Sequence, residues 1–312
     1  MEYILLIVGF VLLIKGADFF VDGASSIAGK LKVPSLIIGL TVVSLGTSMP
    51  EAAVSISASL SGNNGISLGN VVGSNLFNLL VVVGVSAVLL PIATDRAILK
   101  RDMPIAIGIT AALCIMLMDG MMSRLDAVIL LVLFAGYMGL LLWSALKNRT
   151  EEGEQKVMSW GKSILFAVVG AAAIIGGGQL VVENAKVIAA NLGMGETLIG
   201  LTVVAFGTSL PELVTSIVAA KKGDSGIAMG NVVGSNIFNI LFILGMAGAI
   251  MPMNADPVFF IDTGILIAAS LMMLLFAFTG KKTGRVEGAI AVLMYLAYTA
   301  YIIMRAFHIW IF

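Results

Sequence analysis

Two glutamates stand at matching helix breaks inside apolar stretches of the chain. Residues 46–51 read Gly-Thr-Ser-Met-Pro-Glu, and residues 207–212 read Gly-Thr-Ser-Leu-Pro-Glu. Glycine loosens a helix and proline has no N–H, so several carbonyls before each proline lose their helical partners. Four hydroxyl groups lie beside them, on Thr47, Ser48, Thr208 and Ser209. Ionised carboxylates are costly in such surroundings and are usually functional there, so Glu51 and Glu212 are expected to bind ions.

A second polar motif, Gly-Asn-Val-Val-Gly-Ser-Asn-X-Phe-Asn, follows each glutamate at residues 69–78 and 230–239. Residues four apart share one face of a helix. The motif therefore predicts two polar stripes, formed by Asn70, Ser74 and Asn78 and by Asn231, Ser235 and Asn239. Asn75 and Asn236 lie off these stripes, and we expect them to hold the broken helices by hydrogen bonds.

Together the two motifs predict an oxygen cage, made of the two carboxylates and the nearby hydroxyl, amide and carbonyl oxygens. Sites built only from oxygen suit hard cations, and Ca²⁺ takes roughly 6–8 oxygen ligands. Two glutamates would balance one Ca²⁺ or two Na⁺, or protons could neutralise part of their charge. The single histidine and single cysteine disfavour a histidine-built metal site and the usual hydrolase nucleophiles. We therefore expect neither enzyme activity nor a resident cofactor.

The composition places this oxygen cage in a membrane. Of the 312 residues, 59% are apolar and 12% are charged, which is too little charge to cover a water-facing surface. Ten apolar runs are long enough, or nearly so, to cross a bilayer: 3–29, 36–60, 66–92, 103–119, 126–146, 163–190, 197–220, 227–251, 258–279 and 286–305. The sequence thus predicts an all-α membrane protein.

An internal repeat divides the chain. Residues 39–80 and 200–241 align without gaps at an offset of 161 and share 26 of 42 residues. The repeat implies two homologous halves, residues 1–147 and 163–312, joined by a short linker at 148–162. Because each half has an odd number of spans, the second half must enter the membrane upside down. The prediction is ten transmembrane helices in two inverted five-helix repeats, with helices 2 and 7 broken at the glutamates.

The basic residues predict the orientation. With ten spans, 14 of the 18 lysines and arginines fall on one side of the membrane, which the positive-inside rule makes cytoplasmic. We expect a multi-pass plasma-membrane protein with extracellular N- and C-termini and a cytoplasmic 147–162 loop. Asp18, Asp22 and Glu183 are expected to pair helices or to lie at helix ends, with an aqueous vestibule as the alternative.

The paired motifs resemble the two α-repeats of the calcium/cation antiporter superfamily, and in particular its compact prokaryotic sodium/calcium exchangers. The resemblance implies one set of Ca²⁺ ligands, which are carboxylates and backbone carbonyls of Glu51, Glu212, Thr47 and Thr208. It also implies Na⁺ positions formed by hydroxyls of Ser48, Ser74, Ser209 and Ser235 and by carbonyls near Ser44 and Ala205. Asn78 would complete the central cluster.

One position refines this resemblance. Some relatives, including potassium-dependent exchangers, carry aspartate where this chain has Asn239, so asparagine resembles the potassium-independent kind. The 147–162 loop is too short for the calcium-sensing domains of animal exchangers. The expected partners are Na⁺, Ca²⁺ and the lipid bilayer, with no nucleic acid, and the sequence leaves the oligomeric state open.

The expected activity is Na⁺/Ca²⁺ exchange by alternating access. The long first and sixth spans, glycine-rich near residues 16–29 and 170–178, are the candidates for a pair that slides past the core. The first alternative is Ca²⁺/H⁺ exchange with the glutamates as proton carriers, although relatives that use protons diverge more around the Gly-Thr-Ser segments. A passive cation channel is a further alternative, and it predicts flux without a counter-ion.

Overall fold

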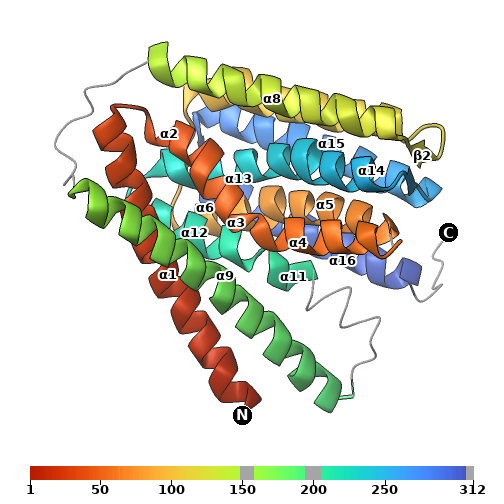
Figure 1. The fold of residues 1–312 in the computed structure, drawn as a ribbon, viewed down its shortest axis with the longest axis horizontal. Coiled ribbons are helices and arrows are strands. Elements are labelled where there is room, and N and C mark those ends of the chain that lie inside the picture. Colours follow the sequence, from red (N-terminus) through yellow and green to blue (C-terminus); the bar gives the residue numbers. More distant parts are fainter. Residues whose placement is uncertain (63, 148–157, 194–204, 307–312) are drawn as a thin grey trace.

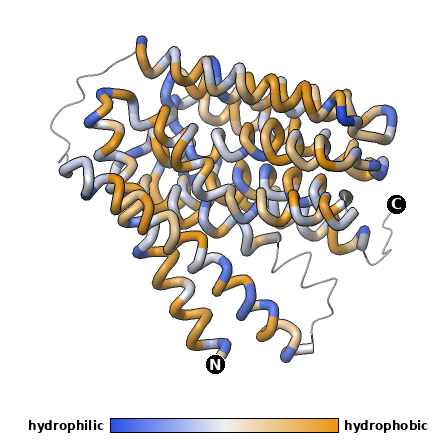
Figure 2. Tube along the Cα trace, viewed as in Figure 1, coloured by the Kyte–Doolittle hydropathy of each residue, from blue (hydrophilic) through white to orange (hydrophobic). Residues whose placement is uncertain are grey.

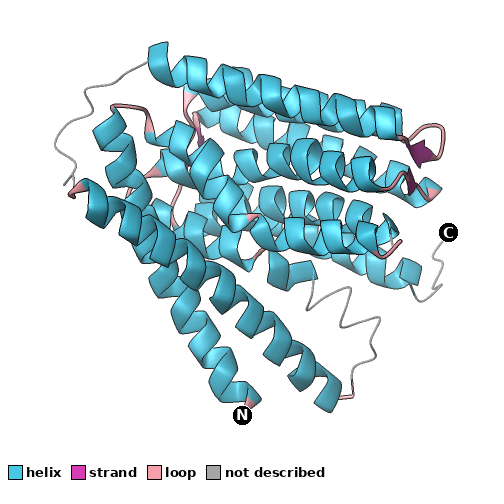
Figure 3. Cartoon of the chain, viewed as in Figure 1, coloured by secondary structure: helices cyan, strands magenta, loops and turns pink. Residues whose placement is uncertain are grey.

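The computed structural model describes residues 1–62, 64–147, 158–193 and 205–306. Within these ranges the chain is helical except for turns, short loops and four two-residue strands (Figures 1 and 3). The expected 148–162 linker and the expected seventh span at 197–220 therefore lie partly outside the described residues.

The helices of the first half are α1 (Glu2–Leu31), α2 (Ser35–Ile38), α3 (Ser44–Thr47), α4 (Met49–Leu60), α5 (Asn64–Phe77), α6 (Val83–Leu89), α7 (Met103–Met116) and α8 (Arg124–Lys147). Those of the second half are α9 (Trp160–Asn191), α11 (Ala205–Thr208), α12 (Leu210–Lys221), α13 (Ser225–Phe238), α14 (Gly245–Ile250), α15 (Pro257–Gly280) and α16 (Arg285–Ala306). In the described part of the chain, four π-helical segments interrupt them: η1 (Gly39–Val43), η2 (Asn78–Val82), η3 (Ile98–Asp102) and η5 (Asn239–Leu244).

Seven helices in the described part are long and apolar enough to cross a membrane, or eight if the bent pair around Ser48 counts as one span. The expected run at 103–119 corresponds to α7, whose 14 residues fall short of the ~20 that a span needs. The expected all-helical membrane architecture is confirmed at this level.

Two helical stretches form the centre of the bundle. In the most apolar stretch of α5–α6 and of α13–α14, 83% and 78% is buried inside the protein. The corresponding shares for α8 and α16 are 22% and 17%. The outer helices expose large apolar side chains such as Leu142 and Phe278, and apolar colour covers much of their length in Figure 2. The asparagine-rich motifs on α5 and α13 therefore lie deep in the protein, away from lipid.

Helices α1 and α9 pack along each other as an antiparallel pair that extends away from the bundle (Figure 1). Glycines spaced seven apart make the contact: a Cβ atom at Gly9 would lie 2.9 Å from the Gly177 carbonyl, and one at Gly23 would lie 2.5 Å from the Ala167 nitrogen. A Cβ atom at Gly170 would lie just as close to the Phe20 nitrogen. The backbones thus touch directly, as small residues allow in membrane helix pairs.

Two short antiparallel ladders join the halves of the chain. Strand β1 (Ile92–Ala93) pairs with β4 (Lys282–Thr283), and β2 (Met121–Met122) pairs with β3 (Met253–Asn254). The 161-residue offset relates β1 to β3 and β2 to β4, so both ladders use equivalent positions. Each ladder fastens a loop of one half to a loop of the other.

Gly177→Ala is expected to destabilise the protein, because its methyl group would lie 2.8 Å from the Gly9 carbonyl and force α1 and α9 apart. Overpacking of this kind costs about 1–3 kcal/mol. Thermal unfolding of the purified protein should show a lower melting temperature. Gly176→Ala is the matched control, since a Cβ atom there meets nothing within 4 Å. Equal melting temperatures for both variants would contradict the close backbone contact.

Candidate ion-binding site

The two predicted glutamates lie together in the protein interior. Glu51 is 1% exposed and Glu212 is fully buried. Each carboxylate accepts a hydrogen bond from the serine of the other repeat: the Ser48 hydroxyl donates to Glu212 Oε1 at 2.9 Å, and the Ser209 hydroxyl donates to Glu51 Oε1 at 3.0 Å. The structure therefore brings both sequence motifs to one place and connects them crosswise.

Breaks in two helices determine the positions of these carboxylates. The segment Ser35–Thr47 meets Met49–Leu60 at an angle of 50°. Ser48 and Ser209 occupy the breaks with nearly the same backbone angles, φ −84° and ψ 8° for one and φ −93° and ψ 8° for the other. A proline is the second residue of each following helix, and the glutamate lies in its first turn. The positive end of a helix dipole favours a negative side chain at this position.

The serines of the predicted stripes approach the same carboxylates. The hydroxyls of Ser74 and Ser235 lie 3.5 Å from Oε1 of Glu51 and Glu212, respectively. Oε1 of each glutamate thus faces two hydroxyl groups, one from its own half and one from the other half. The stripe prediction is confirmed for these serines as neighbours of the carboxylates.

Asn70 and Asn231 fix the glutamate backbone. The Asn70 amide donates to the Glu51 carbonyl at 3.1 Å and to the Ser55 hydroxyl at 2.9 Å. In the second half, the Asn231 amide donates in the same way to the Glu212 carbonyl and the Ser216 hydroxyl, at 3.3 and 3.0 Å.

Sequence reasoning missed the two serine partners, Ser55 and Ser216. The signal was present, because serine recurs at the same place in both repeats, one helical turn after each glutamate.

Asn75 and Asn236 do not hold the broken helices, as the sequence suggested, but join α5 to α13. Each side chain donates to the other residue's backbone carbonyl, at 3.0 and 3.2 Å. Their own amide oxygens accept from the side chains of Asn239 and Asn78, at 3.0 and 3.1 Å. The prediction of hydrogen bonding is confirmed, but the partner was wrong because helical periodicity shows a face and not what that face meets.

Several buried oxygens in this region have no hydrogen-bond partner in the described structure. They include Oε2 of both glutamates and Oδ1 of Asn78 and Asn239, which are equivalent positions in the two repeats. The Thr208 hydroxyl, at the same break, is also without a partner there. A buried acceptor without a partner costs about 1–3 kcal/mol, and more when it is charged. Carboxylate and amide oxygens of this kind are ligands that hard cations accept.

The remaining predicted ligands lie at the ends of the two short helices before the breaks. Thr47 ends α3 and Thr208 ends α11, while Ser44 and Ala205 begin these helices. The Thr47 hydroxyl donates to the amide oxygen of Asn231 at 2.9 Å. The Ser44 carbonyl accepts from the Ser48 nitrogen at 3.0 Å, and the Thr47 hydroxyl lies 3.4 Å from the same carbonyl oxygen.

The residue types around the carboxylates suit a hard cation. No group of three or more histidine, cysteine, aspartate or glutamate side chains that could hold a metal occurs in the described ranges. Any ion bound at Glu51 and Glu212 must therefore draw its other ligands from hydroxyl, amide and carbonyl oxygens. Calcium accepts such ligands in a flexible geometry.

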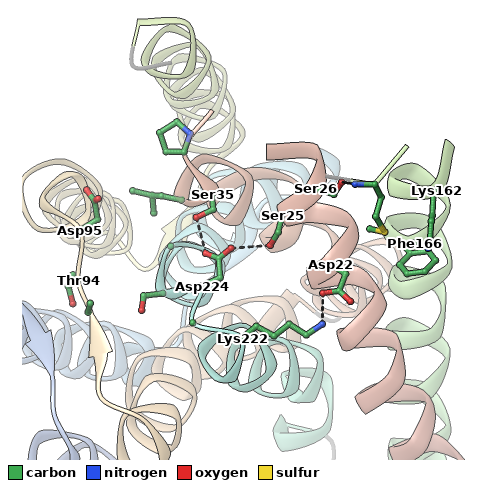
Figure 4. Close-up of a pocket in the computed structure, with 17 residues that line it drawn as sticks. Asp22, Ser25, Ser26, Ser35, Thr94, Asp95, Lys162, Phe166, Lys222 and Asp224 are labelled. Carbon is green, nitrogen blue, oxygen red and sulfur yellow. Dashed lines mark hydrogen bonds and ion pairs between the residues drawn. The ribbon is translucent and has the colours of Figure 1, made fainter. Parts of the chain in front are cut away.

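A separate cavity of about 970 Å³ opens at one end of the bundle, and neither glutamate lines it. Figure 4 shows Asp224 between Ser25 and Ser35, whose hydroxyls donate to it at 3.0 and 2.8 Å. Lys222 lies nearby and pairs with Asp22 at 2.7 Å. These contacts fasten α1 to the loop between α12 and α13.

The predicted role of Asp18 and Asp22 in helix pairing is confirmed, because Lys222, directly after the end of α12, lies within 3.5 Å of Asp18 as well. Asp22 also lines the cavity, so the two expected roles coincide there. Glu183 lies exposed on α9, and it does not line this cavity.

Comparison with known proteins agrees with this geometry along the chain. The family model described as sodium/calcium exchanger protein matches residues 1–143 and 162–304. The putative antiporter CaxA of Alkalimonas amylolytica is 38% identical over 308 residues, covering 95% of this chain and 96% of that protein. The sodium/calcium exchanger MaX1 of Methanosarcina acetivorans is 37% identical, with 95% and 97% covered.

A solved structure shares the fold. The sodium-calcium exchanger NCX_Mj, in crystals soaked with 10 mM Na⁺ and 10 mM Sr²⁺, matches with a TM-score of 0.85 at 36% sequence identity, covering 96% of this chain and 97% of that one. The family match, the relatives and the shared fold each extend over nearly all of the sequence. This multi-pass membrane protein therefore belongs to the sodium/calcium exchanger family.

Proposed function

We propose that this protein is a secondary antiporter that moves Na⁺ inward down its gradient and Ca²⁺ outward through the single oxygen cage. The observation that carries the proposal is a set of four buried oxygens that have no hydrogen-bond partner among the described residues, on Glu51, Glu212, Asn78 and Asn239. They are acceptors only, they include two carboxylates, and they occur at equivalent positions in both repeats. The relatives named as sodium/calcium exchangers support the same choice of ions.

The proposed ligand sets follow the resemblance to that family. Ca²⁺ is bound by the carboxylates of Glu51 and Glu212 and the carbonyls of Thr47 and Thr208. The Na⁺ positions use hydroxyls and carbonyls of Ser48, Ser74, Ser209, Ser235, Ser44 and Ala205. Because the serine hydroxyls of the Na⁺ positions contact the same two carboxylates, Ca²⁺ and Na⁺ compete, and two negative charges balance either one Ca²⁺ or two Na⁺.

The proposed topology is ten transmembrane helices in two inverted halves, broken at Ser48 and Ser209, with both termini outside. Two observations support it. The hydrogen bonds of the oxygen cage recur at the 161-residue offset, as do the two strand ladders. Basic residues also gather at one end of the bundle. Lys282 lies on β4, which pairs with β1, and Lys222 and Lys162 line the same cavity.

Arg305, one of the four basic residues outside the set of 14, fits this topology. Arg305, on the proposed outer side, forms an ion pair with Asp262 at 3.1 Å. A neutralised arginine adds little to the charge difference that orients the chain. The proposed location in the plasma membrane, with a cytoplasmic 147–162 loop, follows from the remaining basic residues.

Alternating access is proposed to occur by sliding of the α1–α9 pair. These helices contact each other through their backbones, whereas α1 contacts the core near the cavity through side chains such as Asp22 and Ser25. Side-chain contacts exchange more easily than close backbone packing, so the pair moves as one unit. We further propose that transport needs no K⁺, because Asn239 leaves only two carboxylates in the oxygen cage, and that no calcium-sensing domain regulates it.

Calcium uptake into vesicles tests the driving ion. Vesicles that contain the protein, loaded with Na⁺ and diluted into Na⁺-free medium with ⁴⁵Ca²⁺, should accumulate calcium, because outward movement of Na⁺ drives the exchange. A proton gradient without Na⁺ should give no uptake above that of empty vesicles. Equal uptake with either gradient would support Ca²⁺/H⁺ exchange instead, and uptake with no gradient at all would indicate a passive channel.

Glu51→Gln should reduce this uptake to the level of empty vesicles while the protein stays folded. Glutamine keeps an oxygen for the Ser209 hydroxyl but removes one of the two charges that balance the ion. Flux and gel-filtration profiles measure the two effects. Glu183→Gln is the control, since it removes an exposed carboxylate outside the oxygen cage. Retained exchange in Glu51→Gln would show that the ions bind elsewhere.

A further inference from the structure

Four asparagines connect α5 and α13 in a closed set of hydrogen bonds beside the carboxylates. Asn75, Asn78, Asn236 and Asn239 are all at least 95% buried. We propose that Asn75 and Asn236 are positioning residues, which turn the amide oxygens of Asn239 and Asn78 toward the transported cations. The proposal rests on the proposed function, because it concerns the same oxygen cage.

A backbone carbonyl decides which way each amide is turned. The Asn236 side chain has one end at the Asn75 carbonyl, 3.2 Å away, and a carbonyl only accepts hydrogen bonds. That end must therefore be the nitrogen, so the other end is the oxygen. This oxygen lies 3.1 Å from the Asn78 amide, which must present its own nitrogen there. The only orientation left for Asn78 directs its oxygen away from Asn236.

The same series of hydrogen bonds also occurs in the opposite direction, from the first repeat to the second. The Asn75 side chain donates to the Asn236 carbonyl at 3.0 Å, and its oxygen accepts from the Asn239 amide at 3.0 Å. The Asn239 oxygen is left over in the same way. Both leftover oxygens are buried and have no partner among the described residues. The network thus fixes the direction of two amides and then leaves one acceptor of each unused.

The direction of an amide determines whether it attracts or repels a cation. Its oxygen is a cation ligand, whereas its NH₂ group carries partial positive charge and only donates. Asn78 lies four residues after Ser74, on the same face of the helix and about 6 Å further along it. Because the Ser74 hydroxyl contacts Glu51, the unused Asn78 oxygen belongs to the same polar face as the carboxylate.

Each half of the chain orients the ligand of the other half. Asn236 of α13 positions Asn78 at the end of α5, and Asn75 of α5 positions Asn239 at the end of α13. Removing the positioning asparagine from one helix should therefore weaken cation binding by the asparagine oxygen of the other helix. The repeated motif by itself does not distinguish this positioning role from direct binding of the cation by all four asparagines.

A double-mutant cycle on purified protein tests the proposal, with Ca²⁺ and Na⁺ titrated separately by calorimetry. Asn236→Ala should weaken binding of at least one of the two ions by about tenfold, the equivalent of roughly 1.4 kcal/mol, because the Asn78 amide is free to turn. Asn78→Ala should weaken the same ion to a similar extent. The double variant should bind no more weakly than Asn78→Ala, since Asn236 acts only through Asn78.

Asn236→Leu gives a second test if alanine prevents folding, because leucine fills a similar volume without an acceptor for Asn78. Asn184→Ala is the control: this buried asparagine bonds within its own helix, to the Leu180 carbonyl at 2.7 Å, and its loss should leave both affinities unchanged. Unchanged affinities in folded Asn236→Ala or Asn236→Leu would overturn the proposal, and so would additive losses in the cycle. Titration of the wild type distinguishes failure of this proposal from failure of the proposed function. If the wild type binds cations but shows no Na⁺-driven flux, the antiporter proposal is contradicted, and the double-mutant cycle still tests the positioning role.

Discussion

Two carboxylates lie within the apolar interior, and each has one oxygen without a hydrogen-bond partner in the described structure. Removing an ionised group from water costs several kcal/mol unless an opposite charge or good hydrogen bonds compensate. The serine hydroxyls at 2.9 and 3.0 Å compensate only in part, because they are neutral. No lysine or arginine of the described chain forms an ion pair with either glutamate. We propose that a transported cation supplies the positive charge that these two carboxylates need.

The rest of the architecture serves this constraint. The breaks at Ser48 and Ser209 allow each glutamate to lie in the first turn of a new helix, at the favourable end of the helix dipole. Helices α5 and α13 supply polar faces in the most buried part of the bundle. The outer helices α8, α15 and α16 cover this centre with apolar side chains. The α1–α9 pair stands apart, held together by glycine contacts and fastened to the core by exchangeable polar contacts.

The sequence alone predicted which side chains come together at the site, but it did not predict the hydrogen bonds that connect them. Glu51 and Glu212 stood out because a repeated carboxylate in an apolar run has few structural explanations, and the four-residue spacing placed Ser74 and Ser235 on the correct face. The crosswise bond from Ser48 to Glu212 did not follow from the sequence, because periodicity describes one helix and not its neighbour.

The partners of Asn75 and Asn236 and the pairing of Lys222 with Asp18 and Asp22 were missed for the same reason. Helix counting was also limited, since α7 is short and the seventh expected span begins outside the described residues.

The central claim is that Ca²⁺ and Na⁺ occupy one oxygen cage and exclude each other. The most direct test is a Ca²⁺ titration of the purified protein in choline, in K⁺ and in Na⁺ at equal ionic strength. Ca²⁺ binding is expected to weaken progressively as Na⁺ increases, to be the same in K⁺ as in choline, and to be lost in Glu51→Gln. Ca²⁺ affinity that does not change with Na⁺ would contradict the shared cage.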